Sequence, residues 1–426
     1  MPLLSAALLA AATTAFVDVT VLPMDSERVL AKQTVLVRDG RIAEVGPAAS
    51  VAVPKDAVTV DGRGRYLMPA LAEMHGHLPP WGDQPVDEAT ARDQMFLFVA
   101  NGVGLVRGMQ GHESQLALRQ RIEKGEVVGP TLVLGSPALN GRLAPDAATG
   151  ARLAREYKAA GFDLLKILEG LSVETYDAVV AEAKSSGIPF GGHVPNSVGL
   201  HRCLEARQAT IDHLDGYVEA LEDDESKIPA LVEATKKAGT AVVPTMALWQ
   251  IFNGTDTPEA LAQRPEVKYV PAAMSAGWAE ARRRALAGAD ARKGARVVAL
   301  RDKVLKALSD GGVPILMGSD APQQYSVPGF SLHREMKAMA AAGMSPYAIL
   351  RSGTSAIADH FGARETFGTV TPGRRADLVL LEADPLKDVA NVERRAGVMM
   401  RGAWLAEAEI QKRLLAIASA NAPAAR

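Results

Sequence analysis

The alternation of hydrophobic and polar residues divides the chain into two strand-rich flanks and a long middle of different character. Residues 15–66 consist of short alternating runs separated by turn residues, and Asp39-Gly40 between two such runs is a typical hairpin signal. The same strand-like pattern returns in residues 363–412, and residues 413–426 follow as a C-terminal tail. Both flanks are therefore expected to be rich in short β-strands.

The middle segment, residues 67–362, alternates apolar β-type runs with stretches of helix length. This is the pattern of repeated βα units, and two of the helical stretches end in Lys and then Gly, as helix C-termini often do. The eight expected strands are 67–77, 102–112, 131–141, 163–170, 188–195, 209–217, 240–248 and 312–322. Eight such units predict an α/β fold, the (β/α)8 TIM barrel.

A longer helical insertion, residues 251–294, follows the seventh expected strand. Its position and size fit a cap over the barrel or an element of an interface. A homo-oligomer is therefore one expectation, although nothing in the composition of the insertion identifies a partner.

The overall composition is that of a globular protein that acts on small molecules. Of the 426 residues, 48% are hydrophobic and 23% are charged, and the formal net charge is −2. A net charge this close to zero argues against a nucleic-acid-binding surface. We therefore expect a small-molecule substrate and no nucleic-acid partner.

The cysteine content and the N-terminus bear on metal ligands and on location. Cys203 is the only cysteine, so no intrachain disulfide or thiolate zinc cluster can form, and histidine or carboxylate must supply metal ligands. Residues 1–14 have an apolar centre and small residues, like the end of an export signal, but lack its basic start. We expect a periplasmic or secreted protein, the alternative being a cytoplasmic protein with an N-terminal extension. No segment has the roughly 20 uninterrupted apolar residues of a transmembrane helix, so no membrane span is expected.

Chemically versatile residues lie at the ends of the expected strands, where a TIM barrel carries its active site. Because side chains alternate along a strand, His75 and His77 face the same way and can bind one cation. Lys166 shares a face with two leucines, so its amine would be buried, where desolvation lowers its pKa. A neutral amine there could react with carbon dioxide to form a carbamate, an anion able to bridge two metal ions. The six positions are His75, His77, Lys166, His193, His213 and Asp320.

Each of these residues alone also has an ordinary structural explanation. A histidine at a strand end often makes a hydrogen bond, Lys166 could extend its amine to the surface, and Asp320 could cap a helix. Six such residues at strand ends of one expected barrel are hard to explain by independent accidents. The combination favours a metal site.

In this order of motifs the sequence resembles the amidohydrolase superfamily, specifically its binuclear members with a carboxylated lysine. The resemblance rests on "MHGH", the lysine of "FDLLKIL", "GGHVP", "IDHLDGY", "GSDAP" and the C-terminal "GTVTPGRRADLVLLEADPL". It implies that residues 15–66 and 363–412 form a small β-sandwich domain beside a barrel of residues 67–362. One departure is Glu73, which stands near a position where many relatives have Asp.

The resemblance also implies the roles of the site residues. His75, His77 and Asp320 would bind the more buried metal, His193 and His213 the second, and the carbamate of Lys166 would bridge them with a hydroxide. That hydroxide would attack the substrate, and Asp320 would accept its proton. Zinc suits the nitrogen and oxygen ligands best, with manganese, cobalt and nickel left open.

Residues near other strand ends are candidates for contact with substrate. His112 could bind a carboxylate or stabilise an oxyanion, and the Tyr217 hydroxyl could donate to a tetrahedral intermediate. Arg107, Asn140 and Gln323 are weaker candidates. Surface or packing roles are expected for three histidines in predicted helices, and a core role for the cysteine; these are His201, His333, His360 and Cys203.

Three functions remain open on the sequence. The first is hydrolysis of an amide or peptide-type C–N bond, as in a dipeptide or N-acyl amino acid. The second is hydrolysis of a lactone, ester, carbamate or organophosphate by the same site. The third is a catalytically inactive binding or assembly protein, against which the retention of all six site residues argues.

Overall fold

The computed structural model describes residues 13–80 and 86–422. Residues 1–12, which make up most of the segment expected to be a remnant of an export signal, lie outside the described residues, and Thr13 already begins the first strand. Within the described part of the chain, no helix is both long enough and apolar enough to cross a membrane.

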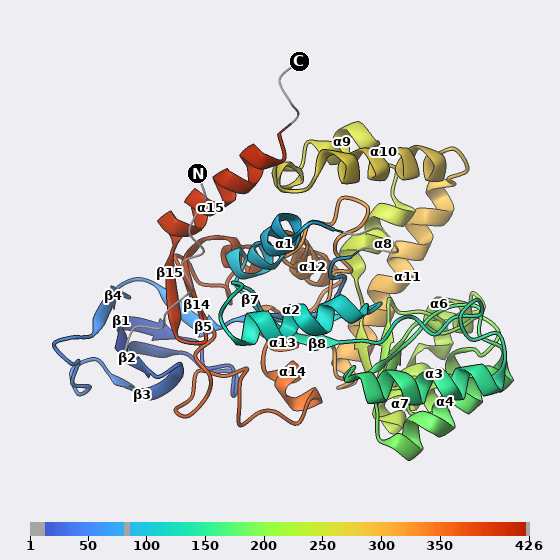
Figure 1. Cartoon of the computed structure of the whole chain (residues 1–426), viewed down its shortest axis with the longest axis horizontal. Helices are drawn as coiled ribbons and strands as arrows, with labels where there is room; N and C mark the ends of the chain where they lie inside the picture. Colours follow the sequence, from blue (N-terminus) through green and yellow to red (C-terminus); the bar gives the residue numbers. More distant parts are fainter. Residues whose placement is uncertain (1–12, 81–85, 423–426) are drawn as a thin grey trace.

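The two ends of the chain meet in one mixed sheet. Its strand order is β15-β14-β13-β5-β1-β2-β3, with β4 paired to β1. In Figure 1 the blue N-terminal strands and the red C-terminal strands lie together on one side of the molecule. The central junction is antiparallel, with Leu67 opposite Leu380, and both side chains are buried in the core of this sheet. The strands are β1 (Thr13–Val21), β2 (Leu30–Arg38), β3 (Arg41–Pro47), β4 (Val58–Asp61), β5 (Tyr66–Pro69), β13 (Leu378–Leu381), β14 (Arg395–Met400) and β15 (Ala403–Ala406).

Seven of the eight expected middle strands form two parallel sheets. The order is β6-β7-β8 in one and β12-β11-β10-β9 in the other. Two parallel bridges, Gly135 with Leu164 and Leu139 with Ile167, connect them. The strands are β6 (Leu71–Gly76), β7 (Val103–Gly108), β8 (Thr131–Leu134), β9 (Leu165–Ile167), β10 (Phe190–Gly192), β11 (Thr210–Asp212) and β12 (Ala241–Val243).

The eighth expected strand, 312–322, is not a continuous strand in the structure. It pairs with β12 through a bridge at Ile315 and with β6 through a bridge at Ala321. Pro314 has no backbone N–H to donate, and Asp320 has a φ of +62°, outside the β region. The segment nevertheless lies between β12 and β6, because Leu316 N donates to Val242 O and Asp320 N donates to His75 O.

Helices follow the parallel strands. The helices expected to end in Lys and Gly are α4 and α7, and each ends at a glycine with positive φ, Gly187 and Gly239. The helices of this part are α1 (Glu88–Ala100), α2 (Glu113–Glu123), α3 (Ala147–Ala160), α4 (Val173–Ser186), α5 (Leu200–Glu205), α6 (Tyr217–Leu221), η1 (Glu225–Lys227), α7 (Ile228–Ala238), α12 (Phe330–Ala341), α13 (Pro346–Ser352) and α14 (Ser355–His360).

The segment 251–294 is helical. It contains the end of α8, then α9 and α10, which lie at the top of the view in Figure 1, and the start of α11. At the other end of the chain, α15 runs across the boundary expected at residue 413, because Leu414 and Ile417 continue its buried face. The bounds are α8 (Met246–Asn253), α9 (Pro258–Ala262), η2 (Pro265–Tyr269), α10 (Ala272–Leu286), α11 (Ala291–Asp310), η3 (Val389–Glu393) and α15 (Glu407–Ala420).

Candidate metal centre

The structure brings the six predicted metal-site residues together. His75, at the end of β6, has its Nε2 atom 3.5 Å from Asp320 Oδ1 and 3.3 Å from Lys166 Nζ. His77, two residues further on, has its Nε2 atom 2.6 Å from the same Asp320 oxygen. The alternation of side chains along β6 therefore directs both imidazoles to one carboxylate, as the sequence predicted.

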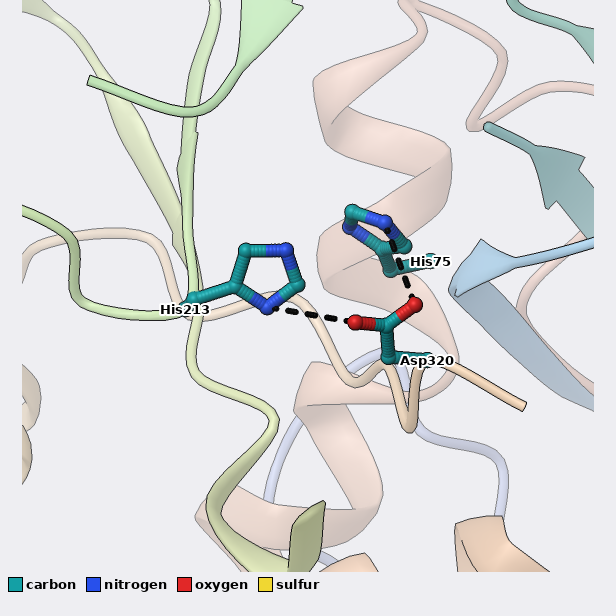
Figure 2. Close-up of side chains that lie close together, drawn as sticks. All are labelled: His75, His213 and Asp320. Atoms are coloured by element: carbon teal, nitrogen blue, oxygen red, sulfur yellow. Dashed lines mark ion pairs between the residues drawn. The ribbon is translucent and has the colours of Figure 1, made fainter. Parts of the chain in front are cut away.

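His193 and His213 complete the group from β10 and β11. The ring of His213 lies 4.6 Å from that of His193 and 4.4 Å from that of His75, measured between centroids. Figure 2 shows His75, His213 and Asp320 pointing toward one another from three separate parts of the chain. One possible ligand atom from each of these three residues lies within 4.8 Å of the others. The spacing is that of donors around a cation.

Two buried atoms at the centre of this group have no hydrogen-bond partner, His213 Nε2 and Asp320 Oδ1. His77 Nε2 approaches that oxygen closely, but without the geometry of a hydrogen bond. An unsatisfied buried nitrogen or oxygen carries a desolvation cost of about 1–3 kcal/mol. Cations bound at these two atoms would use both lone pairs, so the residues fit a metal site.

The Nδ1 atom of each of the four histidines contacts a neighbouring oxygen. His75 Nδ1 lies 2.7 Å from Asp212 Oδ2, and His193 Nδ1 lies 2.6 Å from Asp215 Oδ2. His213 Nδ1 lies 2.8 Å from Thr245 Oγ1. The fourth ring follows the same pattern, with the Nδ1 atom of His77 2.9 Å from Met109 O. With Nδ1 held in this way, Nε2 is the nitrogen of each ring that could bind a metal, the usual arrangement around histidine-bound metals.

Sequence reasoning did not predict Asp212, Asp215 or Thr245. The two aspartates flank His213 in "IDHLDGY", and an acidic residue inside an apolar strand is a signal that could have identified Asp212. The hydroxyl of Thr245 gave no comparable signal, because its role depends on a backbone φ of +47° at the start of α8.

Arg107 contacts residues next to the centre and does not line the cavity. Its guanidinium is buried and contacts Met74 O, Thr210 Oγ1 and Asp212, the last at 2.9 Å. Burial raises the pKa of Asp212, but Arg107 and Lys166 outweigh it and hold that pKa below its usual value. The carboxylate that orients His75 is therefore ionised.

Burial also sets the protonation of other groups in the centre. It lowers the pKa of Lys166 and lowers the pKa of His75 and His213 well below the usual value. Burial opposes ionisation of Asp320, but His75 and His77 bring its pKa to about 2. Neutral imidazoles and an ionised carboxylate are the forms that bind metals.

Glu73 connects β6 to the segment that carries Asp320. Its carboxylate accepts hydrogen bonds from the backbone N–H of His75 and from the N–H and hydroxyl of Ser319. Burial raises the pKa of Glu73 to about 8. This residue therefore helps to position His75 and the segment of Asp320 and does not itself line the cavity.

Three of the predicted substrate contacts lie elsewhere. His112 is exposed at the N-terminus of α2, where its Nδ1 atom contacts Ser114. The hydroxyl of Tyr217 is buried 2.7 Å from Thr235 Oγ1, and Asn140 Oδ1 accepts from two backbone N–H groups of its own loop. The roles expected for His112, Tyr217 and Asn140 are corrected accordingly. The chain turns after each strand end and directs these side chains away from the centre.

The other residues singled out in the sequence lie either at the cavity or away from it. Gln323 does line the cavity at the metal centre. Cys203 and His333 are buried, and His333 Nε2 contacts Asn101 O, in agreement with packing roles. His201 lies on α5 and His360 ends α14, outside the centre.

The metal-site residues line a cavity of about 240 Å³. Its other walls come from the loop after β7, the end of β9, α8 and the loop that follows Asp320. Sequence reasoning did not predict the α8 residues because their contribution depends on how that helix packs. The lining residues outside the six are Gln110, Leu168, Leu248, Trp249, Phe252 and Gln323.

Comparisons with known proteins agree with this geometry. Residues 66–405 match the model of the amidohydrolase family. Among curated proteins, the adenine deaminase of Ruegeria sp. (strain TM1040) is 22% identical over 378 residues, which cover 83% of this chain and 52% of that protein. The chain thus spans about half the length of the curated relatives it matches.

Solved structures share the fold over nearly the whole chain. Bottromycin amidohydrolase has a TM-score of 0.76 at 22% identity, covering 96% of this chain and 90% of that one. A Xaa-Pro dipeptidase with methionine bound in its active site has a TM-score of 0.72 at 18% identity, covering 92% and 100%. At such identities the likeness is one of fold.

Proposed function

The chain belongs to the amidohydrolase family, and from this premise we propose that it is a hydrolase with two divalent metal ions that cleaves an amide or peptide-type C–N bond. The observation that carries the proposal is the pair of buried atoms without a hydrogen bond, His213 Nε2 and Asp320 Oδ1, among three further histidines and a buried lysine. The named relatives, an amidohydrolase and a dipeptidase, favour a C–N bond.

We infer that the middle segment, residues 67–362, forms a (β/α)8 barrel with the mixed sheet as a separate β-sandwich domain. Support comes from the bridges that connect the residues after β8 to Leu164 and to β9, β12 to Ile315, and β6 to Ala321. Together these contacts give every parallel strand a neighbour on both sides. The site then lies at the carboxyl ends of the strands, as in other barrels of this type.

Each ligand has a proposed place. His75, His77 and Asp320 hold one ion, and His193 and His213 hold the other. Lys166 lies beside His75, and carboxylation of its amine by carbon dioxide, with loss of one proton, would give an anion able to bind both ions. Zinc suits this set of nitrogen and oxygen donors. When bound, the ions would polarise the substrate carbonyl and lower the pKa of water to about 7.

The side chains of the protein manage the proton. Asp320 is ionised and central, so its carboxylate can accept a proton from the attacking water and deliver it to the leaving nitrogen. Asp212, Asp215 and Thr245 keep the three imidazoles fixed during this transfer. Imidazoles that are already held in place need no reorientation when charge develops in the transition state.

Metal analysis and substrate assays test the proposal. Protein prepared with zinc and bicarbonate should contain two equivalents of zinc per chain, and Lys166→Ala should reduce both zinc content and activity. Lys236→Ala, an exposed lysine in α7, should change neither. Full zinc content and activity in Lys166→Ala would contradict the bridging role.

A substrate panel tests the choice of bond. It contains dipeptides, N-acyl amino acids, lactones, esters, carbamates, phosphotriesters and adenine, each assayed for kcat/KM. The proposal expects the highest values for dipeptides or N-acyl amino acids. Activity confined to esters, lactones or phosphotriesters would contradict it, and so would activity on adenine alone.

A further inference from the structure

We propose that the α8 side of the metal cavity is a binding subsite for an uncharged, apolar side chain of the substrate, formed by Leu248, Trp249 and Phe252. The inference rests on the proposed function and specifies its substrate class. The three residues lie on one face of α8, since positions 248 and 252 are four apart and 249 and 252 three apart. All three line the same cavity as the metal ligands.

Phe252 is the first observation in support. It is 40% exposed, and in the described part of the chain only four other large hydrophobic residues are exposed. Those four are Val29, Val58, Leu143 and Leu415, none of which lines this cavity. An exposed aromatic ring at the edge of a site costs hydrophobic free energy unless a ligand covers it.

Trp249 continues this apolar surface beside Phe252. Its ring lies at 90° to that of Phe252, with the centroids 5.6 Å apart. The guanidinium of Arg301 lies 4.1 Å from the Trp249 ring. Arg301 also donates to the backbone oxygen of His213, so one cation connects the aromatic residue to a metal ligand. The position of the ring relative to His213 is therefore fixed.

Glu335 fixes the N-terminus of α8. Its buried carboxylate, on α12, accepts hydrogen bonds from the backbone N–H groups of Met246 and Ala247 at 2.8 and 2.7 Å. Thr245, immediately before them, contacts His213. A preorganised wall of this kind loses little entropy when a ligand binds.

The residues that line the cavity disfavour a charged side chain on the substrate. Apart from the metal-site residues, the described lining consists of Gln110, Gln323 and apolar side chains. A charged substrate side chain would lose its hydration there, and none of the described lining side chains outside the metal site carries a charge to replace it. The volume of about 240 Å³ is below the roughly 300–1,000 Å³ of pockets for drug-sized ligands. The subsite thus fits a branched aliphatic or aromatic side chain of a small substrate.

Substrate series test the subsite in zinc-loaded protein. Two series of dipeptides, Gly-X and X-Gly, are assayed with X as Ala, Leu, Phe, Asp or Lys. In one of the two series, kcat/KM should be at least about 10-fold higher for Leu and Phe than for Ala, and lower for Asp and Lys than for Ala. Phe252→Ala should remove about 10-fold from the Leu and Phe values and change the Ala value less than about 2-fold. Phe252→Leu should retain most of the preference.

Leu415→Ala, which truncates an exposed residue on α15, is the matched control and should leave every ratio unchanged. An equal loss for Ala and Phe substrates in Phe252→Ala, or no loss for either, would overturn the subsite. Equal wild-type values for Leu, Asp and Lys would also overturn it, while leaving C–N hydrolysis intact.

Binding separates failure of the subsite from failure of the proposed function. If no amide is hydrolysed, the proposed function fails, and calorimetry with N-acetyl-L-phenylalanine and N-acetyl-L-aspartate decides on the subsite. Preferential binding of the phenylalanine compound, weakened by Phe252→Ala, supports it. Absence of binding, or binding that Phe252→Ala does not change, overturns it.

Discussion

Replacing Asp212 by Asn should destabilise the protein strongly, because the carboxylate of Asp212 is shared by two buried partners. It lies 2.7 Å from His75 Nδ1 and 2.9 Å from the guanidinium of Arg107. Both Asp212 and Arg107 are at most 2% exposed. An Asn side chain keeps the shape but has one oxygen, so its amide N–H₂ must face either the Arg107 guanidinium or the imidazole N–H of His75.

The magnitude follows from the burial of the pair. Removing one partner of a buried ion pair costs about 3–5 kcal/mol, since the remaining charge has no compensation. Proteins have about 5–15 kcal/mol of total stability, so the variant should lose a large part of it. Loss of the carboxylate that orients His75 should in addition weaken metal binding by about 10- to 100-fold.

Urea unfolding of the metal-free proteins measures the first effect, and competition with a chelator measures the second. Asp177→Asn is the matched control, because Asp177 pairs with Arg202 while both side chains are about half exposed. Exposed pairs contribute about 0–1 kcal/mol. If Asp212→Asn costs no more than Asp177→Asn, the buried network does not support the centre as described.

Three further changes have defined outcomes. Burial raises the pKa of Glu335 from 4.5 to about 7. Between these values the native state keeps a proton on Glu335 that the unfolded chain has lost. The free energy of unfolding should therefore fall as the pH rises from about 5 to 7, by up to about 1.4 kcal/mol per pH unit. Glu335→Gln should reduce this slope in urea melts, and an unchanged slope would contradict the assignment. Asp215→Asn should weaken zinc binding by about 10- to 100-fold in chelator competition through loss of its contact with His193; wild-type affinity would count against that role. Gly192→Ala would place a Cβ atom 2.6 Å from Ile167 O and 3.0 Å from Lys166 Cδ, so it should lower both the melting temperature and the zinc content. Gly187→Ala is the control, because its Cβ atom would have no atom within 4 Å. It should cost only about 1–2 kcal/mol of stability, for the left-handed backbone. Equal effects of the two glycine changes would refute the steric argument.

The sequence was sufficient to predict the family and the residues that gather at the centre. Side-chain alternation along β6 predicted that His75 and His77 act together, and the structure directs both to Asp320. Strand ends were recognisable because apolar β-type runs stop there. The match of residues 66–405 to the amidohydrolase family confirms the resemblance to the superfamily, while the binuclear, carboxylated-lysine subtype stays a prediction.

Contacts that depend on packing could not be predicted in this way. Tyr217 follows His213 by four residues, but a positive φ at His213 and a helix starting at Tyr217 direct its hydroxyl to Thr235. Glu335 is 89 residues from the helix whose N-terminus it binds. No local pattern of polar and apolar residues encodes a partner at that distance.

Anomalous diffraction at the zinc edge, from crystals grown with zinc and bicarbonate, tests the central claim most directly. The account predicts two peaks, one bound by His75, His77 and Asp320 and one by His193 and His213, with carbamate density on Lys166 between them. A single peak, no peak, or an unmodified Lys166 amine beside two ions would contradict it.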